Sequence, residues 1–147
     1  MEKAVIISIR GMQCFEDTGD DAIELVTEGQ LKRQEGGFLL SYAESELTGL
    51  NGTTTTLEIE EDKVTLMRMG EFNSQMVFEE GKRHLSLYET PYGALSVGVN
   101  TKRMDCRMGE SGGDIEIDYA IEIDHAVAGE NLFRIHVREQ KRPLLKQ

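Results

Sequence analysis

Two charged residues stand at positions that the alternation of the sequence assigns to the inside of a β-sheet. Glu44 continues the phase of Tyr42, and Arg68 continues the phase of Leu66. An unpaired buried charge is very costly, so an inward carboxylate and an inward guanidinium are expected to meet. The segments that carry them can both flank the strand around Leu57, which would bring the two side chains together.

Two interpretations of this pair stay open. In the first, Arg68 donates two N–H groups to the carboxylate or phosphate of a ligand inside a cavity. In the second, the pair fills one end of the protein or lies near solvent, because the interiors of small barrels are often simply packed with side chains. Further inward hydroxyls would complete either arrangement, and the candidates are Tyr42, Tyr88, Thr90 and Tyr119.

The segment from Arg83 to Thr90 offers two faces. Leu85 and Leu87 lie on one face, and apolar preference predicts that this face points inward. The other face would then lie in solvent; were it inward instead, it would line a polar pocket with His84, Ser86, Tyr88 and Thr90.

No catalytic, metal or nucleotide motif emerges. The histidines are not spaced as metal ligands, and His125 beside Asp124 is interpreted as a surface residue. Cys14 and Cys106 form no C-x-x-C motif and are expected to be free thiols. Ser86 lacks a nucleophile-elbow context, and the glycine pairs lie in turns. We therefore expect no catalytic residue, no metal and no cofactor, and an enzyme acting on a small substrate ranks as the third alternative.

The elements that position these residues are β-strands, which are predicted from the period-two alternation of apolar and polar residues. This alternation predicts a first strand over residues 3–12, a polar connection over residues 14–21, and its clearest strand over residues 115–123. Residues 20–34 also fit a helix, but their β-branched residues and Gly29 favour a strand. About ten strands result, with no convincing helix.

Short polar turns join consecutive strands, so the strands are expected to pair as an antiparallel meander. Closing the meander into a barrel covers its apolar face and removes the exposed edges, and a two-sheet sandwich is the alternative. Residues 1–147 are expected to form this one all-β barrel domain of about 8–10 strands, with residues 141–147 as a flexible tail.

Composition limits the partners. With 27 acidic and 16 basic residues the net charge is −11, which disfavours nucleic acid and anionic membrane surfaces. The sequence contains neither a signal peptide nor an apolar run of the required length of about 20 residues, so we expect a cytoplasmic protein. Met67 and Met69 fall on the outward face of their strand, which would give an apolar patch and allow a homo-oligomer.

Several segments together carry a family resemblance: residues 42–44, 52–57, 68–70, 88–93 and 113–119. They resemble the YwiB-like family of uncharacterised bacterial proteins, most specifically in the Tyr-x-Thr-Pro-Tyr-Gly block that begins at Tyr88. The resemblance implies a calycin-type, lipocalin-like barrel and a bacterial cytoplasmic setting. It implies no activity.

The chain departs from better-known calycins. It contains no tryptophan, so the Gly-x-Trp signature of lipocalins is absent, and it offers no helix pair like the one that covers fatty-acid binders. The leading hypothesis is a non-enzymatic barrel that binds a small ligand beside Glu44 and Arg68. The alternative is a structural or interaction protein with a filled barrel and an external partner.

Overall fold

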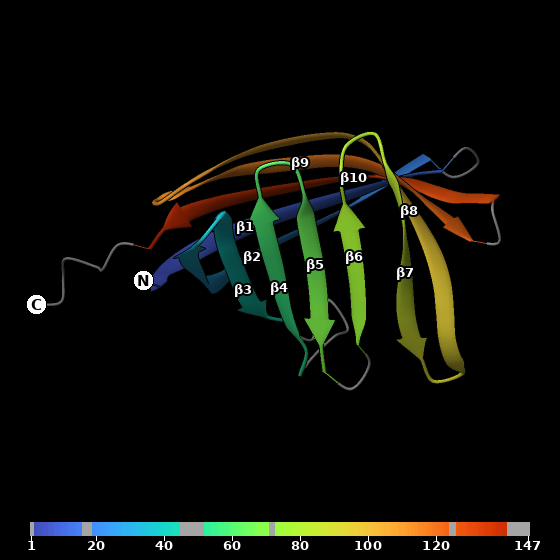
Figure 1. The fold of residues 1–147 in the computed structure, drawn as a ribbon, viewed down its shortest axis with the longest axis horizontal. Helices are drawn as coiled ribbons and strands as arrows, with labels where there is room; N and C mark the ends of the chain where they lie inside the picture. Colours follow the sequence, from blue (N-terminus) through green and yellow to red (C-terminus); the bar gives the residue numbers. More distant parts are fainter. Residues whose placement is uncertain (1, 16–18, 45–51, 71–72, 124–125, 141–147) are drawn as a thin grey trace, which may run out of the picture.

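The computed structural model describes residues 2–15, 19–44, 52–70, 73–123 and 126–140. For residues 12–15, 19–23, 87–90 and 126–128 it describes the backbone but not the side chains. Within these residues, ten antiparallel strands form one closed barrel in the order β1-β10-β9-β8-β7-β6-β5-β4-β3-β2 (Figure 1). The strands are β1 (Glu2–Phe15), β2 (Gly19–Gln34), β3 (Gly37–Ala43), β4 (Thr54–Glu60), β5 (Val64–Met69), β6 (Ser74–Phe78), β7 (Arg83–Thr90), β8 (Gly93–Gly109), β9 (Gly112–Ile123) and β10 (Ala126–Glu139).

This order confirms the all-β meander, because every strand pairs with its sequence neighbours and β1 closes the barrel on β10. The predicted tail at residues 141–147 lies outside the described residues. The described residues contain no helix that is long and apolar enough to cross a membrane.

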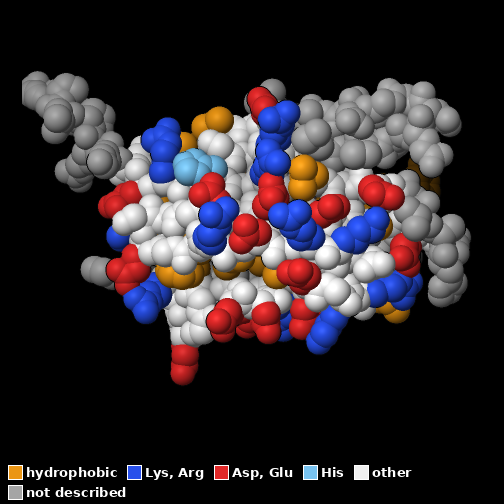
Figure 2. All heavy atoms as spheres, turned by 90° about the horizontal axis from the view of Figure 1, so that it is seen from above, with side chains coloured by type: hydrophobic (Ala, Val, Ile, Leu, Met, Phe, Trp, Pro, Cys, Tyr) orange, Lys and Arg blue, Asp and Glu red, His pale blue; other side chains and the backbone are white. Residues whose placement is uncertain are grey.

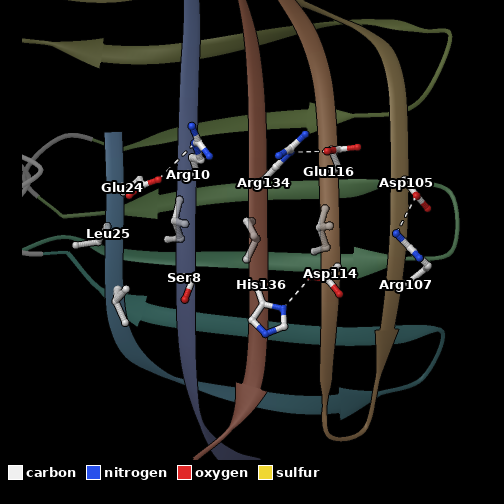
Figure 3. Close-up of a pocket in the computed structure, with 14 residues that line it drawn as sticks. Ser8, Arg10, Glu24, Leu25, Asp105, Arg107, Asp114, Glu116, Arg134 and His136 are labelled. Carbon is white, nitrogen blue, oxygen red and sulfur yellow. Dashed lines mark hydrogen bonds and ion pairs between the residues drawn. The ribbon is translucent and has the colours of Figure 1, made fainter. Parts of the chain in front are cut away.

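The barrel has a long-stranded and a short-stranded part. β1, β2, β8, β9 and β10 contain 12 to 17 residues each, whereas β3 to β7 contain 5 to 8. In Figure 1 the long strands arch over and behind the shorter β3 to β6, and Figure 3 shows the two groups crossing. The space between them holds the core.

The core is apolar and closely packed. Ile7, Leu57 and Ile117 have no exposed surface, and Phe78 is 1% exposed. The rings of Phe78 and Tyr119 pack edge to face across the interior, with their centroids 4.8 Å apart. The alternating apolar residues that predicted the strands therefore form a filled interior over much of the barrel.

One predicted connection is wrong. β1 runs to Phe15 and β2 starts at Gly19, so most of the polar segment 14–21 is strand. Cys14 pairs with Asp20 and Gln13 with Asp21, and such pairing satisfies the backbone N–H and C=O groups whatever the side chains are. The strand prediction for residues 20–34, on the other hand, is confirmed.

Candidate functional site

The site begins with a row of directly paired residues on four neighbouring strands. Tyr42 on β3 pairs with Thr55 on β4, Thr55 pairs with Arg68 on β5, and Arg68 pairs with Ser74 on β6. Side chains of directly opposed residues share one face of a sheet. Thr55 has no exposed surface and Tyr42 is 6% exposed, so this face is the interior.

Glu44 joins this row from the residue after the end of β3. It lies two positions beyond Tyr42 and therefore on the same face, and its backbone N–H donates to the carbonyl of Thr53 at 2.8 Å. Its side chain is only 2% exposed. The Thr55 hydroxyl donates a hydrogen bond to Oε2 of the carboxylate.

Arg68 meets the same carboxylate oxygen from the other side of β4. Its Nε lies 3.9 Å from Oε2 of Glu44, which makes an ion pair but is too long for a hydrogen bond. This Nε is buried and has no hydrogen-bond partner among the described residues. The Arg68 side chain is nevertheless 29% exposed. The guanidinium is thus anchored inside and accessible from one end of the barrel.

Tyr42 is held in its neutral form. Burial raises the pKa of its hydroxyl far above the usual value, and the neighbouring Glu44 charge and a hydrogen bond to Glu44 raise it further. The charge of Arg68 acts in the opposite direction but is outweighed. Tyr42 therefore serves as a hydrogen-bond donor to the Glu44 carboxylate.

The remaining predicted site residues are not brought into this cluster by any described contact. The side chains of Tyr88 and Thr90 lie outside the described ones, although the backbone of Tyr88 continues the row by pairing with Ser74. Tyr119 is half-buried on β9 and packs on Phe78.

The predicted orientation of β7 is wrong. Leu85 is 68% exposed, whereas Ser86 is 5% exposed. Ser86 pairs with Val97, which is buried on β8, and directly paired residues must share a face. The register with β8 therefore outweighs the apolar preference of the single strand. The side chain of Leu87 lies outside the described ones.

Sequence reasoning missed Thr55 and Ser74. Thr55 alternates in phase with Leu57 and Ile59, which are buried. A threonine in phase with a buried apolar row is the signal that could have identified it. Ser74 opens its strand and carries no comparable signal.

The described residues hold no group of three or more potential metal ligands. Nε2 of His84 lies 3.0 Å from Oε1 of Glu79, and Nδ1 of His136 lies 2.8 Å from Oδ1 of Asp114. Hydrogen bonds from His84 and Lys82 lower the pKa of Glu79. Cys106 is a free thiol whose pKa is raised by burial and by Asp105, while Cys14 and His125 have side chains outside the described ones.

A groove of about 550 Å³ crosses the outer face of the long strands (Figure 3). Its charged side chains neutralise one another: Arg10 lies 3.5 Å from Glu24, Arg107 lies 3.4 Å from Asp105, and Arg134 and His136 have acidic partners of their own. The groove thus holds charges of both signs side by side, with no strong excess of one sign for a charged ligand. The interior cluster is therefore the stronger candidate site.

Comparison with known proteins identifies the fold and the family of this protein. An "Uncharacterized beta-barrel protein YwiB" of Bacillus subtilis (strain 168) is 26% identical over 124 residues, which cover 84% of this chain and 86% of that protein. The crystal structure of the ywiB protein from Bacillus subtilis has the same fold, with a TM-score of 0.83 and 21% identity over 95% of this chain and 94% of that one. Residues 7–135 match the family described as "Domain of unknown function (DUF1934)". This match spans most of the chain, so the protein belongs to the DUF1934 family, and the resemblance to YwiB-like proteins is confirmed.

Proposed function

We propose that this protein is a cytoplasmic, calycin-type barrel that binds a small molecule without transforming it, and that Arg68 anchors an anionic group of the ligand. The observation that carries this proposal is the state of Arg68. Its buried Nε has no hydrogen-bond partner among the described residues, while its side chain stays 29% exposed at the end of the barrel. The exposed part of the guanidinium can donate charge-assisted hydrogen bonds to an arriving carboxylate or phosphate.

Glu44 positions the guanidinium of Arg68 without accepting all of its hydrogen bonds. At 3.9 Å the carboxylate attracts Arg68 without accepting a hydrogen bond from Nε. Thr55 and Tyr42 instead donate to the carboxylate. The planar donor edge of Arg68 is thereby held in place, and pre-organisation of this kind lowers the entropic cost of binding.

The filled core favours a second candidate, in which the barrel is solid and an external partner docks on its surface. Leu57 has no exposed surface and Phe78 is 1% exposed, so the apolar part of the interior leaves little room for a bulky ligand. The ligand of the first proposal must therefore be small and must sit at the polar end.

Titration calorimetry with butyrate, succinate, inorganic phosphate and glycerol 3-phosphate tests the proposal. At least one probe should bind to the wild type, and Arg68→Leu should abolish that binding. Arg134→Leu is the matched control, because it removes one positive charge from the outer face and should leave the affinity unchanged. Arg68→Lys keeps the charge but not the two-pronged geometry and should weaken binding about tenfold or more.

Two outcomes would overturn the proposal. One is equal binding by the wild type and Arg68→Leu. The other is the absence of binding by all four probes, together with no co-purifying small molecule in native mass spectra of protein taken directly from cells. That second result would leave the filled barrel with an external partner as the function.

A further inference from the structure

The two sides of the barrel differ sharply in charge. On the outward face of β3 to β6, the only charged residues among those described are Glu58 and Glu60, both near the turn that follows β4. The rest of that surface is polar but uncharged, or apolar. We define the uncharged face by the outward residues Thr54, Thr56, Met67, Met69 and Val77 of β4 to β6. Leu85 of β7 borders this face, two positions from the outward Arg83, which pairs with Glu122 at 2.6 Å.

The uncharged face is continuous from β4 to β5. Thr54 pairs with Met69 and Thr56 pairs with Met67, so these four side chains form two adjacent rows. Met69 is 58% exposed and Leu85 is 68% exposed, so both present apolar surface to a partner. Ser86 of β7 faces inward because it pairs with the buried Val97, so the adjacent Leu85 faces outward.

The opposite side carries dense charge of both signs. Figure 2 looks onto the molecule from above, a quarter-turn from Figure 1, and shows acidic and basic side chains interleaved on that face. The outward rows of the long strands supply them, for example Arg10, Arg134 and Glu116, which are aligned by the register of β1, β10 and β9. Among the described residues, charged side chains are therefore denser on the long strands than on the outward face of β4 to β6.

We propose that the uncharged face is the contact surface between two copies of this chain. Each copy has a net charge of −11, so two copies repel each other unless they meet where charge is lacking. A two-fold dimer places a patch against the same patch, so a charge near the two-fold axis would face the same charge of the other copy. A face of threonine, methionine and valine, bordered by Leu85, avoids this cost, and methionine adapts readily to an opposing surface.

This inference is independent of the ligand site, because it rests on outward side chains and the proposed ligand site rests on inward ones. It also specifies the response to salt. Salt screens the repulsion between the two acidic copies, so dimerisation should strengthen as the salt concentration rises. An interface held together by ion pairs would respond in the opposite way.

Sedimentation equilibrium over a range of protein and salt concentrations tests the proposal. The wild type should dimerise, more strongly at high salt, and both Leu85→Glu and Met69→Glu should be monomeric under the same conditions. Val26→Glu is the matched control: Val26 is 67% exposed on the charged side, almost the same exposure as Leu85, and its replacement should leave the dimer intact. Circular dichroism and urea unfolding verify that each variant is folded.

A wild type that stays monomeric throughout would overturn the proposal. So would a dimer that persists in both Leu85→Glu and Met69→Glu, or one that Val26→Glu disrupts equally. Should a glutamate variant fail to fold, Leu85→Thr and Met69→Thr replace it. These substitutions remove apolar area without adding charge, and an unchanged dimerisation constant in both would likewise overturn the proposal.

Discussion

Arg68 and Glu44 belong to segments that do not touch each other in the sheet, yet they meet at 3.9 Å because β4 lies between them. Thr55 is the residue of β4 that separates them, and it donates a hydrogen bond to the same carboxylate. Three strands are thus joined at one end of the barrel by side chains as well as by their backbones.

Removing one partner of the ion pair should lower the free energy of unfolding more than removing both partners. Arg68→Leu leaves the buried Glu44 carboxylate without its counter-charge, whereas Arg68→Leu combined with Glu44→Leu leaves neither charge. We expect a double-mutant cycle measured by urea unfolding to give a coupling free energy of about 1–3 kcal/mol, nearer the lower value because Arg68 is partly exposed to solvent. Additive effects of the two single substitutions would show that the pair is not coupled.

Tyr42 should make the protein sensitive to alkali. Its pKa is raised in the folded state, so above about pH 10 the unfolded chain loses this proton while the folded protein retains it. The stabilisation is complete below that pH and declines as the pH rises further. At pH 7 Tyr42→Phe should cost about 1 kcal/mol through the lost hydrogen bond to Glu44, and this deficit should shrink above pH 10. Urea unfolding at pH 7, 9, 10 and 11 measures it, and a deficit that grows with pH would contradict the assignment.

Gly29 gives Tyr42 the space it occupies. A Cβ on Gly29 would lie 2.5 Å from the Ser41 carbonyl oxygen, 2.5 Å from Cδ1 of Ile7 and 3.2 Å from Cβ of Tyr42. Gly29→Ala should therefore destabilise the protein by about 1–3 kcal/mol in thermal or urea unfolding. Gly11→Ala is the matched control, since a Cβ there meets nothing within 4 Å, and it should be neutral or slightly stabilising. Equal effects of the two substitutions would refute this explanation.

Two buried threonines should respond in opposite ways to replacement by valine. The Thr101 hydroxyl is buried and has no hydrogen-bond partner among the described residues, so Thr101→Val should leave the stability unchanged or raise it. The Thr55 hydroxyl donates to Glu44, and Thr55→Val should cost about 1–3 kcal/mol because a buried carboxylate loses a donor. Urea unfolding compares the two directly, and a larger loss for Thr101→Val would contradict this account.

Much of the fold was already visible in the sequence, because alternation with period two follows directly from the geometry of a strand. Ile115 and Ile117 alternate with acidic residues, as the inner and outer sides of a barrel wall require, and both are buried. The inward phase of Glu44 and Arg68 could be predicted for the same reason. Turn residues between short runs then limited the pairing to a meander, which has few ways to cover its apolar face.

Tertiary structure alone decided what the polar residues contact. The orientation of β7 depended on its register with β8, so Leu85 faces out and Ser86 faces in, against local apolar preference. Thr55 became a partner of Glu44 because β4 lies between the two charged segments. The sequence by itself determined which residues share a face of each strand, since that depends on the local backbone. Distances between strands depend on register and closure, which arise from contacts among residues far apart in the chain, so only the folded barrel could bring Arg68 to Glu44.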